Sequence, residues 1–96
     1  MSEDIQRLHA TIHGWVQGVG FRYFVAEQAR QFELTGWVRN RYERTVETVA
    51  EGRKADLEGF LTALGRGPSA SKVTRVDSSW HEATGEFSTF KIRMTS

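Results

Sequence analysis

A short run of glycines beside an arginine is the part of the sequence best suited to chemistry. Residues 14–22 read Gly-Trp-Val-Gln-Gly-Val-Gly-Phe-Arg and join a predicted strand to a predicted helix. Backbone N–H groups left free at the start of a helix attract anions, and glycines allow those groups to converge. The guanidinium of Arg22, within the first helical turn, adds a planar cationic fork that matches phosphate oxygens. The segment indicates a phosphate site, and the alternative is an ordinary glycine-rich connection.

The order of residues in this segment excludes two larger phosphate-binding loops. A Walker-type loop ends in Gly-Lys followed by Ser or Thr, and no such run occurs in the chain. A dinucleotide fingerprint needs a third glycine three residues after Gly20, and that position is Tyr23. The loop is therefore short, with Arg22 as its charge, and it suits a single phosphate better than a nucleotide.

Asn40 is the second candidate, because it lies near the end of a predicted strand and carries no charge that would repel an anion. Its side-chain amide can donate through nitrogen and accept through oxygen, which suits a residue that orients a water molecule. Asparagine is also common where strands end in turns, so a purely structural role is the alternative.

Together these segments give the chain a resemblance to the acylphosphatases, small enzymes that hydrolyse carboxyl–phosphate mixed anhydrides. The matching stretches are residues 14–22, residues 36–40 (Gly-Trp-Val-Arg-Asn), Thr45-Val46-Glu47, Glu51-Gly52, Gly67-Pro68, Trp80 and residues 85–90. The similarity covers essentially the whole chain, and the first of these motifs is highly specific. One departure is the hairpin after Asn40, where family members usually have a glycine and this chain reads Arg-Tyr-Glu-Arg over residues 41–44.

The resemblance implies a role for each residue of the two main motifs. Arg22 and Asn40 are the expected catalytic residues, with Arg22 holding the phosphoryl group and Asn40 positioning the attacking water. The expected phosphate-binding residues are Gln17, Gly18, Val19, Gly20, Phe21 and Arg22. The implied reaction is hydrolysis of an acyl phosphate to a carboxylate and inorganic phosphate, without metal or cofactor. Inorganic phosphate is then expected to act as a competitive inhibitor as well as a product.

Composition sets the broad class of protein. Ninety-six residues suit one domain over 1–96, and a net charge of +1 argues against a nucleic-acid partner. The chain has no cysteine, which excludes disulfides and thiolate metal sites. No apolar run approaches the length of about 18 residues that indicates a membrane span. These features predict a cytoplasmic protein with no membrane partner, and we expect a free-standing monomer.

Hydrophobic periodicity predicts the elements that position the two motifs. Alternation predicts strands over 7–16, 37–41, 45–51 and 72–80, a bulge or twist near Val73 and Val76, and a short final strand with Phe90, Ile92 and Met94. Spacing of three and four residues predicts helices over 21–33, ended by Thr35-Gly36, and over 53–64. The resulting fold class is α+β, a ferredoxin-like α/β sandwich. Its predominantly antiparallel sheet has four to five strands, with two helices on one face.

Other candidate residues fit structural roles better than chemical ones. His9 and His13 lie four residues apart on one strand, roughly 13 Å, which is too far for a shared metal and fits a solvated face. Glu47 and Glu51 are separated in the same way and are interpreted as exposed cross-strand partners rather than a catalytic pair. Trp15 could form a wall of the substrate pocket or a surface aromatic. Arg39 and Arg41 are expected to point away from Asn40.

An alternative function remains open on this fold, which hosts many activities. The chain could be a non-catalytic ferredoxin-like module that binds a ligand or regulates another protein, including an acylphosphatase-like domain serving a larger maturation enzyme. An RNA-binding sheet is disfavoured because residues 45–51 contain acidic side chains and no aromatic. The sequence does not identify the physiological acyl phosphate.

Overall fold

The computed structural model describes residues 4–96, which form one five-stranded sheet and two helices. In chain order the elements are β1 (Ile5–Trp15), α1 (Phe21–Gln31), β2 (Thr35–Asn40), β3 (Val46–Arg53), α2 (Lys54–Arg66), β4 (Lys72–Glu82) and β5 (Phe90–Ile92). The strands lie in the order β4-β1-β3-β2-β5. Neighbouring strands are antiparallel except β2 and β5, which are parallel. The predicted ferredoxin-like α+β class is confirmed.

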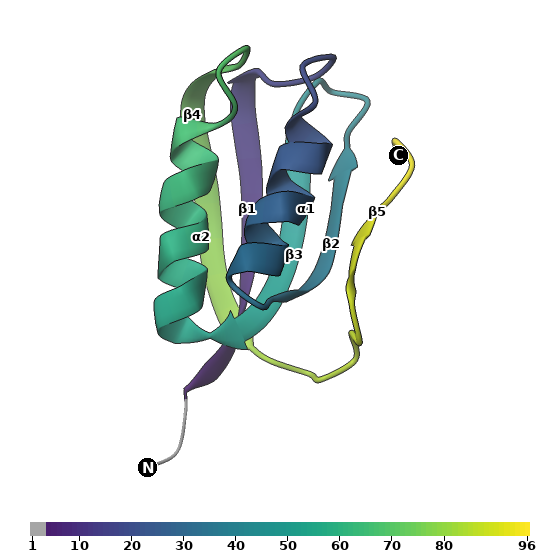
Figure 1. Ribbon diagram of the computed structural model, residues 1–96. Coiled ribbons are helices and arrows are strands. Elements are labelled where there is room, and N and C mark those ends of the chain that lie inside the picture. Colours follow the sequence, from purple (N-terminus) through teal and green to yellow (C-terminus); the bar gives the residue numbers. More distant parts are fainter. Residues whose placement is uncertain (1–3) are drawn as a thin grey trace.

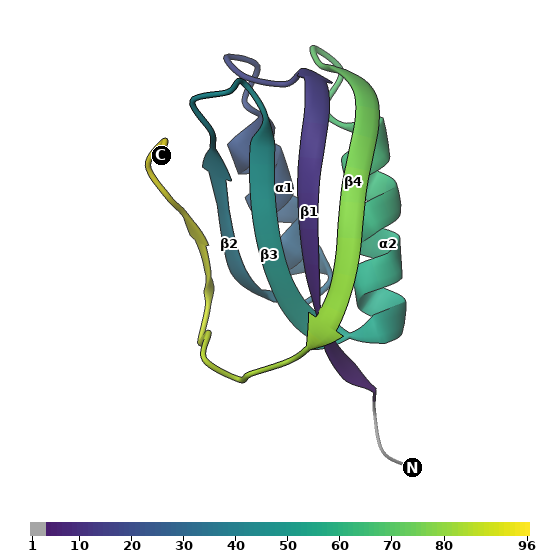
Figure 2. The same cartoon turned by 180° about the vertical axis from the view of Figure 1, so that it is seen from behind.

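Both helices cover the same face of the sheet, and Figure 2 shows the opposite face without a helix. The core lies between these layers, because alternate residues of β1 and one stripe of each helix point into it. Its most buried members include Leu8, Ile12, Phe21, Val25, Leu57, Phe60 and Leu64. No helix within residues 4–96 is long and apolar enough to cross a membrane.

The end of α1 differs from the prediction. The helix ends at Gln31, and Thr35 and Gly36, which were expected to end it, are the first residues of β2. Glu33 adopts a left-handed conformation with φ of 57°. Its N–H donates to the Arg30 carbonyl at 3.1 Å, and that of Leu34 donates to the Ala29 carbonyl at 2.8 Å. This pair of bonds is a Schellman motif, which usually has glycine at the left-handed position. Here that position is Glu33, so no glycine in the sequence marks the end of the helix.

The outer strands agree with the prediction in one feature and differ in another. In the β1–β4 pair, His13 lies opposite Arg75 while the next residue lies opposite Val73, so Thr74 is the extra residue of a bulge. The predicted irregularity near Val73 is therefore confirmed. The final strand stops at Ile92, and Met94, which was expected to continue it, is 86% exposed.

The hairpin between β2 and β3 retains the backbone conformation that favours glycine. Arg44 has φ of 77°, its N–H donates to the Arg41 carbonyl at 3.0 Å, and the Arg41 N–H donates to the Thr45 carbonyl at 2.9 Å. This is a turn followed by one left-handed residue, a common three-residue hairpin loop. An arginine at the left-handed position carries strain of roughly 1 kcal/mol relative to glycine.

We therefore expect Arg44→Gly to stabilise the protein slightly. The substitution relieves the strain at φ of 77°, and the greater freedom of glycine in the unfolded chain opposes this gain by about 0.4–1 kcal/mol. Chemical denaturation of both proteins measures the net change in the free energy of unfolding. A clear destabilisation would show that this turn does not need a positive φ.

Candidate active site

Three segments far apart in the sequence meet at one end of the sheet. The loop from β1 to α1, the β2–β3 hairpin and the C-terminal segment lie together at the top of Figure 1. In the loop, Gly18 and Gly20 have φ of 75° and 74°, so both occupy the left-handed region that glycine adopts without strain. Gly20 is the N-cap of α1 and provides no side-chain cap, so the helix start has no built-in acceptor. This backbone is well suited to receive an anion.

Gln17 joins this loop to the hairpin. Its Nε2 atom donates to the backbone carbonyls of Arg41 at 2.8 Å and Thr45 at 2.9 Å. The side chain is therefore committed to holding the hairpin against the loop. A contribution of Gln17 to phosphate binding, as the sequence predicts, has to come from its backbone amide.

A small cavity of about 120 Å³ lies between the loop, the start of α1 and the end of β2. It is lined by Val16, Gly18, Gly20, Phe21, Arg22, Tyr23 and Asn40. The structure thus brings the two predicted catalytic side chains, Arg22 and Asn40, to the same cavity. The side chain of Val19, also predicted to bind phosphate, is half-buried and packs against the hydrophobic core, so its predicted contribution has to come from its backbone N–H.

The Arg22 side chain is half-buried and oriented by the C-terminal segment. Its Nη1 atom donates to the backbone carbonyl of Arg93 at 3.0 Å. No carboxylate within residues 4–96 forms an ion pair with Arg22, so its positive charge remains available to an anionic ligand. The segment after β5 is itself fixed to β2, because the Arg93 N–H donates to the Val38 carbonyl at 2.8 Å.

Asn40 is the last residue of β2 and is positioned through its backbone. It lies opposite Val46 in β3, and its carbonyl accepts a hydrogen bond from the Ser96 N–H at 3.1 Å. Its side-chain amide has no hydrogen-bond partner among the described residues, so both the donor and the acceptor can serve a water molecule.

Arg39 pairs with Glu47 of the neighbouring strand β3. The Arg39 Nε atom is 2.9 Å from Glu47 Oε1, and His9 Nε2 is 2.7 Å from Glu47 Oε2. Partial burial raises the pKa of Glu47, but the hydrogen bonds from His9 and Arg39 outweigh burial and keep that pKa below its ordinary value. Glu47 is thus a tightly held anion away from the cavity. His13 is similarly paired with Asp77 at 2.9 Å.

Glu51 was expected to be exposed, and this prediction is wrong. Its side chain is only 5% exposed, and residues of the connection from β4 to β5 hydrogen-bond to it. Glu51 accepts hydrogen bonds from the backbone N–H groups of Thr84 at 2.9 Å and Gly85 at 3.0 Å, and from Arg7 Nε at 2.7 Å. Burial raises the pKa of Glu51, but these donors lower it below the ordinary value. Glu51 therefore fixes the connection that leads to β5, a structural role.

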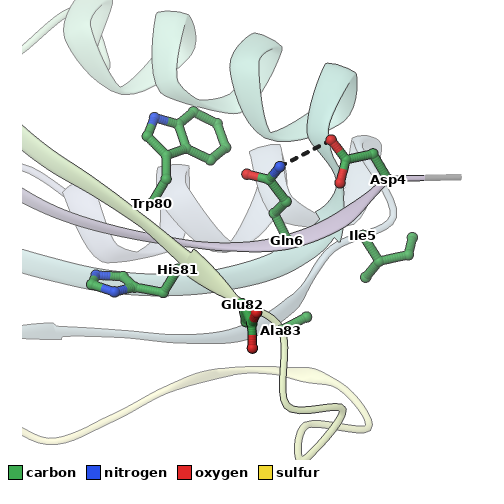
Figure 3. Close-up of a pocket in the computed structure, with 7 residues that line it drawn as sticks. All are labelled: Asp4, Ile5, Gln6, Trp80, His81, Glu82 and Ala83. Carbon is green, nitrogen blue, oxygen red and sulfur yellow. Dashed lines mark hydrogen bonds between the residues drawn. The ribbon is translucent and has the colours of Figure 1, made fainter.

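A larger cavity lies at the opposite end of β1 and contains no convergent set of reactive groups. It measures about 540 Å³ and is lined by Asp4, Ile5, Gln6, Trp80, His81, Glu82 and Ala83. Figure 3 shows Trp80 and His81 on opposite sides of β4. Gln6 Nε2 donates to Asp4 Oδ2 at 2.9 Å. Volume alone therefore does not identify the site, and the smaller cavity is the one that brings together the candidate residues Arg22 and Asn40.

Val16, Tyr23 and the backbone of Arg93 contribute to the smaller cavity or to the placement of Arg22 and are absent from the predicted site. Tyr23 lines it although the side chain is 73% exposed, and the Arg93 carbonyl orients Arg22. A backbone carbonyl has no residue-type signature, so Arg93 could not have been found from the sequence. Tyr23 follows Arg22 directly, and only the position of α1 relative to β2 brings it to the rim.

Comparison with known proteins agrees with this geometry. The acylphosphatase family model matches residues 8–92. An acylphosphatase of Moorella thermoacetica is 49% identical over 90 residues, which cover 94% of this chain and 96% of the relative. The crystal structure of acylphosphatase from Bacillus subtilis superposes with a TM-score of 0.89 at 38% identity, covering 92% of this chain and 98% of that one.

A larger protein contains the same fold. Full-length HypF, in a phosphate- and nucleotide-bound form, matches with a TM-score of 0.88 and 32% identity. The match covers 99% of this chain but 13% of HypF, so the fold occurs both in proteins of this size and within longer ones. With a family model that covers nearly its whole length and relatives that match end to end, the chain belongs to the acylphosphatase family of enzymes.

Proposed function

We propose that the protein hydrolyses acyl phosphates to a carboxylate and inorganic phosphate at the cavity formed by Arg22 and Asn40. The observation that carries this proposal is that two side chains line one small cavity beside a helix start without a side-chain cap: a guanidinium that has no ion pair within residues 4–96 and an amide that has no hydrogen bond there. The size of the cavity supports a single phosphoryl group. A volume of about 120 Å³ is below the range of about 300–1,000 Å³ typical of whole small-molecule sites, so the acyl group must lie outside it.

The division of labour follows from the chemistry of each group. Backbone N–H groups of residues 17–22 and the Arg22 guanidinium bind the non-bridging phosphoryl oxygens, where negative charge must be stabilised during transfer. Asn40 holds a water molecule in line with the leaving carboxylate, so that positioning replaces a strong base. A carboxylate is a weak base and a good leaving group, which removes the need for a general acid or a covalent nucleophile.

The same reasoning gives the expected ligands and working form. Inorganic phosphate should occupy the cavity after turnover and compete with substrate, since it presents the same oxygens. We expect residues 1–96 to act as one domain and as a monomer, because the β1–α1 loop, the start of α1 and the end of β2 of one chain supply the residues that line the cavity. A cytoplasmic location and a small-molecule substrate remain our expectations.

The test is release of phosphate from benzoyl phosphate, with phenyl phosphate, a monoester, as the control. The proposal predicts rapid release from the acyl phosphate and little from the monoester, whose phenolate is a poorer leaving group. Binding of phosphate without turnover of benzoyl phosphate would instead support a non-catalytic ligand-binding module.

We expect activity to survive exhaustive treatment with EDTA. No group of three or more His, Asp or Glu residues within residues 4–96 could hold a metal ion, and the chain has no cysteine. The measurement is benzoyl phosphate turnover before and after chelation. Loss of activity that a divalent ion restores would contradict the proposed mechanism.

A further inference from the structure

A second cavity lies directly beside the small cavity lined by Arg22 and Asn40, which we call the phosphate cavity. The second cavity is large enough for an organic group. It measures about 330 Å³ and is lined by Gly14, Trp15, Val16, Gln17 and Arg44. Val16 lines both cavities, and Gly18, the residue after Gln17, lines the first. A phosphoryl group held in the smaller cavity therefore has an adjoining space into which its substituent can extend. This volume falls at the lower end of the range for small-molecule sites.

Arg44 gives this second cavity an unpaired positive charge. Its side chain is exposed and has no hydrogen bond or ion pair among the described residues, whereas Arg39 and Arg41 of the same hairpin region both lie within 4 Å of Glu47. Arg44 also keeps a strained φ of 77°, at a position where glycine would be unstrained. Strain retained at one residue is typical of functional sites.

Trp15 gives the same cavity an apolar wall. It is the last residue of β1, directly before the phosphate loop, and it is 72% exposed. The indole is thus free to cover an aliphatic or aromatic chain. Of the two roles that the sequence allows for Trp15, a pocket wall or a surface aromatic, its place in this cavity favours the pocket wall.

We propose that the cavity between Trp15 and Arg44 is the acyl-group subsite, and that it selects acyl chains that end in a second anionic group. The carbon chain packs on Trp15 while the Arg44 guanidinium attracts the distal carboxylate or phosphate. Arg44 acts on the acyl end, so it changes substrate preference without touching the phosphoryl group. This inference rests on the proposed function, because it assumes that the phosphoryl group is bound at Arg22.

The experiment compares succinyl phosphate with butyryl phosphate, which have the same number of carbons and differ in a distal carboxylate. Arg44→Gln removes the charge, and Arg44→Lys retains it; both variants keep an unbranched side chain at the strained position. Lys54→Gln is the matched control. It removes one positive charge next to Arg53, which lies opposite Ile5, at the far end of the 11-residue strand β1 from Trp15.

For Arg44→Gln we expect kcat/KM for succinyl phosphate to fall roughly two- to fivefold, the size expected for one exposed charge pair. The fall should appear in KM and shrink at high salt, while butyryl phosphate is unaffected. Arg44→Lys should restore most of the preference, and Lys54→Gln should leave it unchanged.

Trp15→Ala tests the apolar wall. We expect kcat/KM for butyryl phosphate to fall by a larger factor than that for acetyl phosphate, whose acyl group is too short to cover the indole. Equal effects of Arg44→Gln on succinyl and butyryl phosphate, or no effect on either, would overturn the subsite. The proposed function would stay intact in that case as long as the wild-type protein hydrolyses both compounds. Failure of the wild-type protein to hydrolyse any of these compounds would overturn the proposed function itself, and the subsite with it.

Discussion

Replacing Arg22 with alanine is expected to reduce kcat/KM for acyl phosphates by roughly a hundred- to a thousandfold, the usual effect of losing one preorganised oxyanion donor. Arg22 is the guanidinium that lines the phosphate cavity, and no carboxylate within residues 4–96 neutralises it. Its loss should also weaken inhibition by inorganic phosphate, because product and substrate present the same oxygens. Steady-state kinetics with phosphate as inhibitor measure both effects.

Arg22→Lys provides the matched control. It keeps the charge but replaces the planar guanidinium with an ammonium. An ammonium does not reproduce the fixed fork of N–H groups that can donate to the Arg93 carbonyl and to two phosphoryl oxygens in one orientation. We therefore expect poor rescue of turnover. Near-native turnover and unchanged phosphate inhibition in Arg22→Ala would remove Arg22 from the mechanism.

Asn40→Ala should lower kcat strongly while the affinity for inorganic phosphate stays close to that of the wild-type protein. The Asn40 side chain has no partner among the described residues, and its backbone is held between β3 and Ser96, so truncation should leave the strand in place. If Asn40 holds the water and Arg22 holds the phosphate, the two losses separate in kinetics.

Phosphate titrations of the two alanine variants provide the comparison. An equal loss of phosphate affinity in both would place Asn40 in the phosphate site rather than at the water. Asn40→Asp, which has the same shape, should in addition repel the phosphoryl group. It is therefore expected to raise KM where Asn40→Ala does not.

The order of the helices and strands could be predicted because each one has a hydrophobic periodicity that is visible in the sequence. Leu8, Ala10 and Ile12 alternate and are fully buried, and the stripe that includes Leu57 and Phe60 reaches the core. The residues at which helices and strands end were harder to predict from the sequence. The end of α1 depends on Glu33 in a left-handed conformation, a state that only the surrounding hydrogen bonds reveal.

The two catalytic candidates could be identified from their sequence motifs, whereas the residues that surround them are set by tertiary contacts. Arg22 and Asn40 lie on different elements, and only the alignment of β2 with the loop brings them to one cavity. The burial of Glu51 follows from the path of the β4–β5 connection, which no local pattern specifies. The commitment of the Gln17 side chain to two hairpin carbonyls is a long-range contact of the same kind.

In the β2–β3 hairpin, the resemblance to the acylphosphatases and the lack of a glycine led to different expectations for the backbone at Arg44. The family pattern implies a left-handed residue at position 44, and the absence of glycine made that conformation uncertain. The structure has φ of 77° at Arg44, so the left-handed conformation is present although the residue is an arginine. This combination is what motivates the acyl-group subsite.

The most direct test of the mechanism is the fate of the solvent oxygen. Benzoyl phosphate is hydrolysed by the wild-type protein in water enriched in ¹⁸O, and both products are examined by mass spectrometry, with an enzyme-free sample as the control. Attack of a water held by Asn40 on a phosphoryl group held by Arg22 places the label in inorganic phosphate and leaves benzoate unlabelled. Label in benzoate would mean that water attacks the carbonyl carbon, which would contradict the roles assigned to both residues.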